Sequence, residues 1–260
     1  MREESAAKAG NTKLGARFGT TRWSVVLSSG KGSSEAEKAH SALSQLCRIY
    51  WRPIFTYICR QGYTVENAQD LTQDFFLTLL SGRLLQSADP SRGRFRSLLL
   101  KALQNFLSDA HGKRSAKKRG GGLKFVSWDD WMTDGQSHFT LPVQAVESWG
   151  PERLFDVRWA AAVVEQALRR LREECEARGR GRVFDVLSRT LAADRIDTSY
   201  AELGKELHAD ESTVKHLVHQ LRQRYRALLR SEVSRTVENE ADLDEEIRYL
   251  CAMLTSNERK

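Results

Sequence analysis

The apolar residues of the chain recur with a helical period over most of its length. From Phe95 to Ala110, apolar residues follow one another at steps of three and four, and polar residues fill the opposite side. The same spacing predicts a helix over 65–80 and another from about Leu43 that is kinked or restarted at Pro53. Because the helical period dominates, the sequence predicts an all-α fold.

An irregular stretch divides the helical pattern into two parts. Residues 120–152 begin with three glycines, contain Pro142 and Pro151 and sustain no apolar stripe, which is typical of a linker. The three tryptophans of this stretch indicate that parts of it pack on a domain. The predicted organisation is an N-terminal extension (1–30), a helical domain (31–119), the linker (120–152), a second helical domain (153–235) and an acidic amphipathic helix (236–260).

The segment 200–219 has the pattern of a helix-turn-helix. Asp210 is placed to cap the second helix, and Gly204 is small where the two helices approach. His208 occupies the turn position that usually holds glycine. A positive φ there would strain a non-glycine residue, although histidine tolerates it better than most. The polar side of the second helix is suited to base edges and phosphates. We assign DNA contacts on it to Ser212, Thr213, Lys215, His216, His219 and Gln220. A helical hairpin that binds no ligand is the alternative.

The positive charge of the chain is concentrated in one block. The formal net charge is +7, from 41 Lys and Arg and 34 Asp and Glu. Residues 92–119 hold nine basic residues and one acidic residue, whereas residues 236–260 hold seven acids and three bases. A block of this density predicts contact with a polyanion, with a solvated basic face as the alternative.

Several classes of protein do not fit the sequence. No run of about 18 apolar residues predicts a membrane span, and residues 1–30 lack the apolar core of a secretory signal. The four cysteines are scattered, which favours reduced thiols and a cytoplasmic location. His216 and His219 lack nearby residues that would complete a metal site, so we expect no metal, no cofactor and no catalytic residues.

Taken together, these segments resemble the extracytoplasmic-function group of bacterial sigma factors, long subgroup. Residues 66–77 are similar to the region 2 helix that docks on the RNA polymerase clamp, and 92–110 to the helix that melts and reads the minus-ten element. Residues 18–24 are similar to the opening of a long subgroup of this family. The resemblance implies two helical domains, region 2 at 31–119 and region 4 at 153–235, the latter carrying a helix-turn-helix for the minus-thirty-five element.

The resemblance also implies residue roles and partners. Asp70, Gln73 and Asp74 share one helix face by their spacing and would bind polymerase. The contacts near the minus-ten element would come from Arg94, Lys101, Asn105, Asp109, Lys113, Arg114, Lys117, Lys118 and Arg119. The expected function is to bind core RNA polymerase and to direct promoter recognition, DNA opening and initiation. Core polymerase and promoter DNA are the expected partners, and an anti-sigma factor is a further candidate.

Two other functions stay open on the sequence. One is a stand-alone helix-turn-helix regulator that binds DNA without polymerase. The other is a metal-dependent nucleic-acid enzyme that uses Asp70, Asp74, Asp89 and Asp109. For the acidic helix, packing on 153–235 is expected, and a latch that covers the DNA-facing surface is the alternative.

Overall fold

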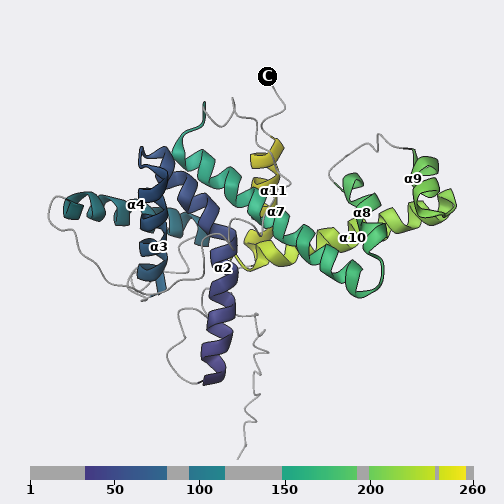
Figure 1. Ribbon diagram of the computed structural model, residues 1–260, viewed down its shortest axis with the longest axis horizontal. Helices are drawn as coiled ribbons and strands as arrows, with labels where there is room; N and C mark the ends of the chain where they lie inside the picture. Colours follow the sequence, from purple (N-terminus) through teal and green to yellow (C-terminus); the bar gives the residue numbers. More distant parts are fainter. Residues whose placement is uncertain (1–32, 81–93, 115–147, 192–198, 238–239, 256–260) are drawn as a thin grey trace, which may run out of the picture.

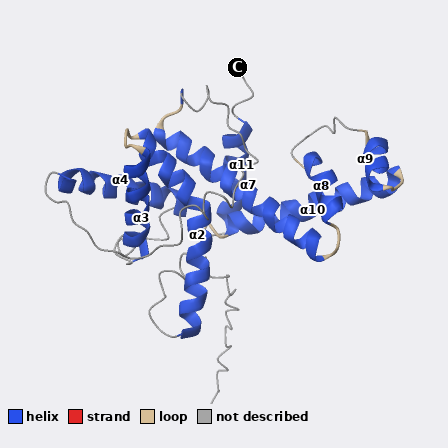
Figure 2. Cartoon of the chain, viewed as in Figure 1, coloured by secondary structure: helices blue, strands red, loops and turns tan. Residues whose placement is uncertain are grey.

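The structure, a computed structural model, describes residues 33–80, 94–114, 148–191, 199–237 and 240–255. Within these ranges the regular elements are helices, so the all-α prediction is confirmed (Figure 2). The elements are α2 (Ser33–Arg60), α3 (Val65–Leu80), α4 (Phe95–Arg114), α7 (Pro151–Ala177), α8 (Gly181–Leu187), a 3-10 turn (Ser188–Thr190), α9 (Tyr200–Leu207), α10 (Glu211–Ser234) and α11 (Glu240–Thr255). The predicted extension and most of the predicted linker lie outside the described residues.

The helix around Pro53 differs from the prediction. α2 continues through Pro53 to Arg60, so the predicted restart is wrong, whereas the alternative of a kink stays a prediction. Proline removes one backbone hydrogen bond, but tertiary packing stabilises helices more than local propensity does. Here Pro53 is buried and its neighbour Ile54 is fully buried, because α2 packs along α3 and α7.

α7 is the central helix of the molecule and belongs to the two main hydrophobic cores (Figure 1). Its first half buries Phe155, Trp159 and Val163 against α2. Its second half buries Ala167 and Leu171 against α8 and α10. The two cores are therefore joined by one uninterrupted helix, and the split at residue 153 into two domains stays a prediction.

The larger core joins α2, α3, α4, the first half of α7 and α11. The apolar stripe predicted for 95–110 lies in this core, with Leu99, Leu103 and Leu107 buried. The largest fully buried side chains of this core are Trp159, Tyr50, Tyr57, Phe75, Phe155, Ile54, Ile58, Leu99 and Leu103. No helix among the described residues is long and apolar enough to cross a membrane.

The acidic helix predicted near the C-terminal end is present as α11. Leu243 and Leu250 are buried in the larger core, and Ile247 and Leu254 are partly buried beside them. α11 packs on α7 and α10, both within the predicted second domain. It therefore forms part of the packed interior, and its apolar side follows the predicted spacing of four, three and four residues.

Candidate nucleic-acid and protein interfaces

The first helix of the helix-turn-helix begins and ends with local signals. Ser199 and Glu202 form a reciprocal capping box at the start of α9. His208 follows α9 as its C-cap, and its φ of 54° and ψ of 41° are left-handed. The Ala209 amide donates to the Gly204 carbonyl at 3.0 Å, which closes the end of the helix.

Gly204 and Asp210 fix the turn between α9 and α10. A Cβ at Gly204 would lie 2.6 Å from the carbonyl oxygen of Ala209, so only glycine fits there without a backbone shift. The Asp210 carboxylate accepts from the Thr213 amide at 2.7 Å and from its hydroxyl at 3.1 Å. These hydrogen bonds hold the pKa of Asp210 below its usual value. The predicted cap is confirmed.

A small aliphatic core sets the angle between α9 and α10. Leu203 and Val214 are fully buried, and Val218 is 2% exposed. They pack in one cluster with Phe184 and Leu187 of α8. Because the second helix is held by both its cap and this core, its exposed side is presented on a rigid support.

The exposed side of α10 carries the predicted recognition residues. They are all exposed: Ser212, Thr213, Lys215, His216, His219 and Gln220. Several interact with one another or with neighbours. Lys215 pairs with Glu211 at 2.6 Å, and His216 is hydrogen-bonded to Gln220 at 2.7 Å. The hydroxyl of Thr213 is engaged in the helix cap. The face offers donors and acceptors of the kind that read base edges, and DNA contact stays a prediction.

An acidic face lies on the exposed side of α3, a helix whose opposite side packs in the larger core. Asp70 and Asp74 are exposed and Gln73 is half-buried, whereas Leu71 and Phe75 are buried behind them. Burial raises the pKa of Asp74, and the charge of Asp70 raises it further. Two like charges four residues apart repel each other on a helix. A cationic partner surface would therefore relieve a repulsion that the free protein carries.

The exposed side of α4 carries part of the predicted minus-ten set. Lys101, Asn105 and Asp109 are exposed and lie one turn apart on the side opposite the buried stripe. Lys113 and Arg114 belong to the last turn of α4, and their side chains are not among those described. The predicted contacts Lys117, Lys118 and Arg119 also lie outside the described residues.

Arg94 is placed differently from the rest of that set. It lies just before α4, and its guanidinium pairs with Glu245 at 2.6 Å and with Glu246 at 3.0 Å, both on α11. The positive charge of Arg94 is therefore neutralised within the molecule. Sequence reasoning missed these partners because about 150 residues separate the two segments.

Arg96 stands at the centre of a buried ionic network between three helices. It pairs with Asp156 of α7 at 2.5 Å and with Glu246 at 3.2 Å. The hydroxyl of Tyr249 donates to Asp156 at 2.5 Å, and the Arg96 guanidinium lies 4.2 Å from the centre of the Tyr249 ring. These carboxylates raise the pKa of Arg96 against the effect of its burial. The network ties the start of α4 to α7 and α11.

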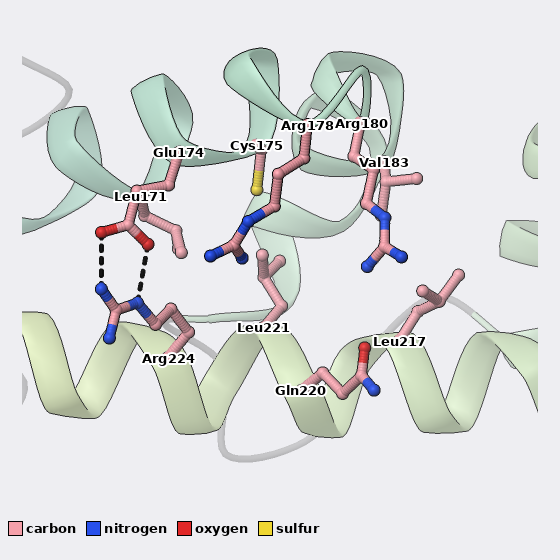
Figure 3. Close-up of a pocket in the computed structure, with 10 residues that line it drawn as sticks. All are labelled: Leu171, Glu174, Cys175, Arg178, Arg180, Val183, Leu217, Gln220, Leu221 and Arg224. Carbon is pink, nitrogen blue, oxygen red and sulfur yellow. Dashed lines mark hydrogen bonds and ion pairs between the residues drawn. The ribbon is translucent and has the colours of Figure 1, made fainter.

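A pocket lies between α10 and the end of α7 (Figure 3). Arg224 and Glu174 form a bidentate pair with two contacts of 2.6 Å on one side of it. The guanidiniums of Arg178 and Arg180 point toward α10 from the turn before α8, and Gln220 lies below them. Sequence reasoning did not include the two arginines. The run Arg178-Gly179-Arg180-Gly181-Arg182 at a helix break is the signal for them.

The described part of the chain contains neither a group of residues that could hold a metal ion nor a disulfide. Among the described residues, no group of three or more His, Cys, Asp or Glu is placed to hold a metal ion. Asp89, which the enzyme alternative needs, lies outside those residues. All four cysteines are free, and burial raises the pKa of Cys47 to about 12, which makes that thiol unreactive near neutral pH.

Comparison of the chain with protein-family models, with curated proteins and with solved structures gave no match. The residues and their geometry are therefore the basis for assigning a function.

Proposed function

We propose that this protein is a bacterial transcription initiation factor of the sigma type. It binds core RNA polymerase through α3, contacts promoter DNA through α10 and α4, and has no catalytic chemistry of its own. In this proposal α10 enters the major groove of the upstream element. The exposed side of α4 meets the downstream element where the strands open.

The observation that carries the proposal is the acidic face of α3. Asp70 and Asp74 are exposed, and their carboxylates would repel the phosphates of DNA. A basic protein surface suits this face. α3 and α9 lie toward opposite ends of the molecule (Figure 1), so one protein partner and one DNA duplex have separate surfaces to occupy.

The arrangement of α4 supports a second contact with nucleic acid. The helix presents Lys101 and Asn105 to solvent, and its last turn holds Lys113 and Arg114, the first two basic residues of the run 113–119 in the sequence. Cations bind phosphates without regard to sequence, and polar side chains add contacts to bases. An all-α protein with two separated DNA-facing helices and an acidic face fits an adaptor between polymerase and promoter.

Gel filtration with bacterial core RNA polymerase tests the proposal. The wild-type protein is expected to co-elute with the polymerase. A variant with Asp70→Ala, Gln73→Ala and Asp74→Ala is expected to elute alone, because the exposed acidic face is lost while Leu71 and Phe75 keep α3 packed.

The matched control is a variant with Glu173→Ala and Glu176→Ala. Both residues are exposed on α7, and the change removes the same two negative charges elsewhere on the surface. This variant is expected to co-elute like the wild type. Failure of the wild type to bind polymerase at low salt contradicts the proposal, and equal loss in both variants contradicts the role of α3.

The second candidate is a regulator that binds DNA without polymerase. The completeness of the helix-turn-helix favours it, because α9 and α10 have their caps, their turn and their own core. In that case the protein alone binds a specific duplex tightly, and changing the α3 face leaves both binding and regulation unaltered.

A further inference from the structure

The start of α4 carries no surplus positive charge, although it lies in the most basic block of the sequence. Arg94 and Arg96 are surrounded by three carboxylates, those of Asp156, Glu245 and Glu246, at N–O distances between 2.5 and 3.2 Å. Two positive charges therefore face three negative ones. A phosphate that approaches Arg94 meets a site that carboxylates already occupy.

The two arginines of this cluster differ in access. The side chain of Arg96 is 6% exposed and lies against the rings of Trp159 and Tyr249. The side chain of Arg94 is 24% exposed and stands at the edge of the cluster. Arg96 is thus an interior anchor, whereas Arg94 is within reach of a ligand from outside.

The two glutamates differ in the same way. Glu246 is fully buried and bridges both arginines, so its removal from the cluster would leave charges unpaired in the interior. The side chain of Glu245 is 63% exposed and pairs with Arg94 alone in the cluster. Ion pairs at such exposed positions are weak and sensitive to salt, so another anion can replace Glu245.

We propose that Glu245 is an intramolecular competitor for DNA phosphate at Arg94. α11 thereby restrains the contact of α4 with DNA, and a phosphate must displace Glu245 before Arg94 can bind it. Glu246 and Asp156 hold Arg96, and with it α4, in place during this exchange. The inference rests on the proposed function only in that α4 contacts DNA.

Asp244 provides a matched control on the same helix. It neighbours Glu245, is exposed, and pairs with Arg230 of α10 at 2.5 Å. Glu245→Gln and Asp244→Asn remove the same charge from adjacent positions. Glu245→Gln releases Nη2 of Arg94, whose Nε stays paired with Glu246. Asp244→Asn releases Arg230 instead, which lies ten residues beyond Gln220, the last predicted recognition residue of α10.

The experiment measures the affinity of the full chain for a short mixed-sequence duplex and for one of its single strands, by fluorescence anisotropy over a series of salt concentrations. Glu245→Gln is expected to bind about two- to fivefold more tightly at low salt, the range that a weak exposed pair allows. The slope of log affinity against log salt is expected to steepen by about 0.7–0.9, because one more phosphate is neutralised. Arg94→Ala is expected to abolish the gain in a double-variant cycle.

The variants distinguish results that support the role of Glu245 from results that overturn it. Tighter binding by Glu245→Gln, unchanged binding by Asp244→Asn and loss of the gain with Arg94→Ala support the inference. Equal gains in Glu245→Gln and Asp244→Asn, or a gain that survives Arg94→Ala, overturn it. Unchanged affinity of Glu245→Gln, or absence of DNA binding by both the wild type and Glu245→Gln, overturns the inference alone, because co-elution with polymerase tests the proposed function separately.

Discussion

The two main hydrophobic cores differ in residue composition. The larger core contains most of the buried aromatic side chains, among them Tyr50, Phe75 and Trp159, together with the buried ionic network around Arg96. The smaller core is mainly aliphatic, and Phe184 is the buried aromatic residue in it. Where the larger core has an ionic network, this unit has helix caps: Ser199 caps the start of α9, and Asp210 caps the start of α10.

The cores also differ in how far along the chain their parts come from. The smaller core uses residues between 167 and 228, so its contacts lie within one stretch of the sequence. The larger core joins residues near 50, 100, 160 and 245. The proposed DNA-reading unit therefore forms from one continuous segment, whereas the proposed polymerase-binding unit depends on helices that are distant in sequence.

The largest effect is expected in the larger core, from Arg96→Ala. Removal of the guanidinium leaves Glu246 and Asp156 as charges without their buried partner, which lowers the free energy of unfolding by about 3–5 kcal/mol. Urea denaturation followed by tryptophan fluorescence measures this, because Trp159 lies against Arg96. Lys101→Ala, exposed on the same helix, is the control and is expected to stay within about 0.5 kcal/mol of the wild type. Equal stability of the two variants would show that the network does not hold α4.

A smaller effect is expected in the smaller core, from Gly204→Ala. The added Cβ meets the Ala209 carbonyl at 2.6 Å, and the forced shift costs about 1–3 kcal/mol. Gly181→Ala is the control, because its nearest neighbour is a flexible side-chain atom at 3.5 Å. Amide hydrogen exchange is expected to accelerate in α9 and α10 of Gly204→Ala and to stay unchanged in α2 and α3. Equal acceleration in α2 would show that the two cores unfold as one unit.

The smallest effect is expected from acidification at the cap of α10. The folded pKa of Asp210 lies below its unfolded value, so its contribution to stability is present above the unfolded pKa and is lost as the pH falls through the folded value. Thermal melts followed by circular dichroism, from neutral pH to below pH 4, are expected to show a larger acid loss in the wild type than in Asp210→Asn. Asparagine keeps the capping oxygen but does not titrate there. Identical acid loss in both proteins would contradict this role of the carboxylate.

Much of the local structure could be predicted from the sequence. The bounds of α3, the buried stripe of α4 and the cap at Asp210 all follow from neighbouring residues. The acidic face of α3 was predictable for the same reason, because residues at steps of three and four share one side of a helix.

The tertiary structure decided the rest. α2 continues through Pro53, α7 serves two cores, and Arg94 is neutralised by Glu245 and Glu246 about 150 residues away. Caps, turns and helical periods arise from hydrogen bonds and contacts among residues a few positions apart. The partner of a charge and the side of a helix that is buried depend on which distant segments pack together, and local sequence does not encode that arrangement.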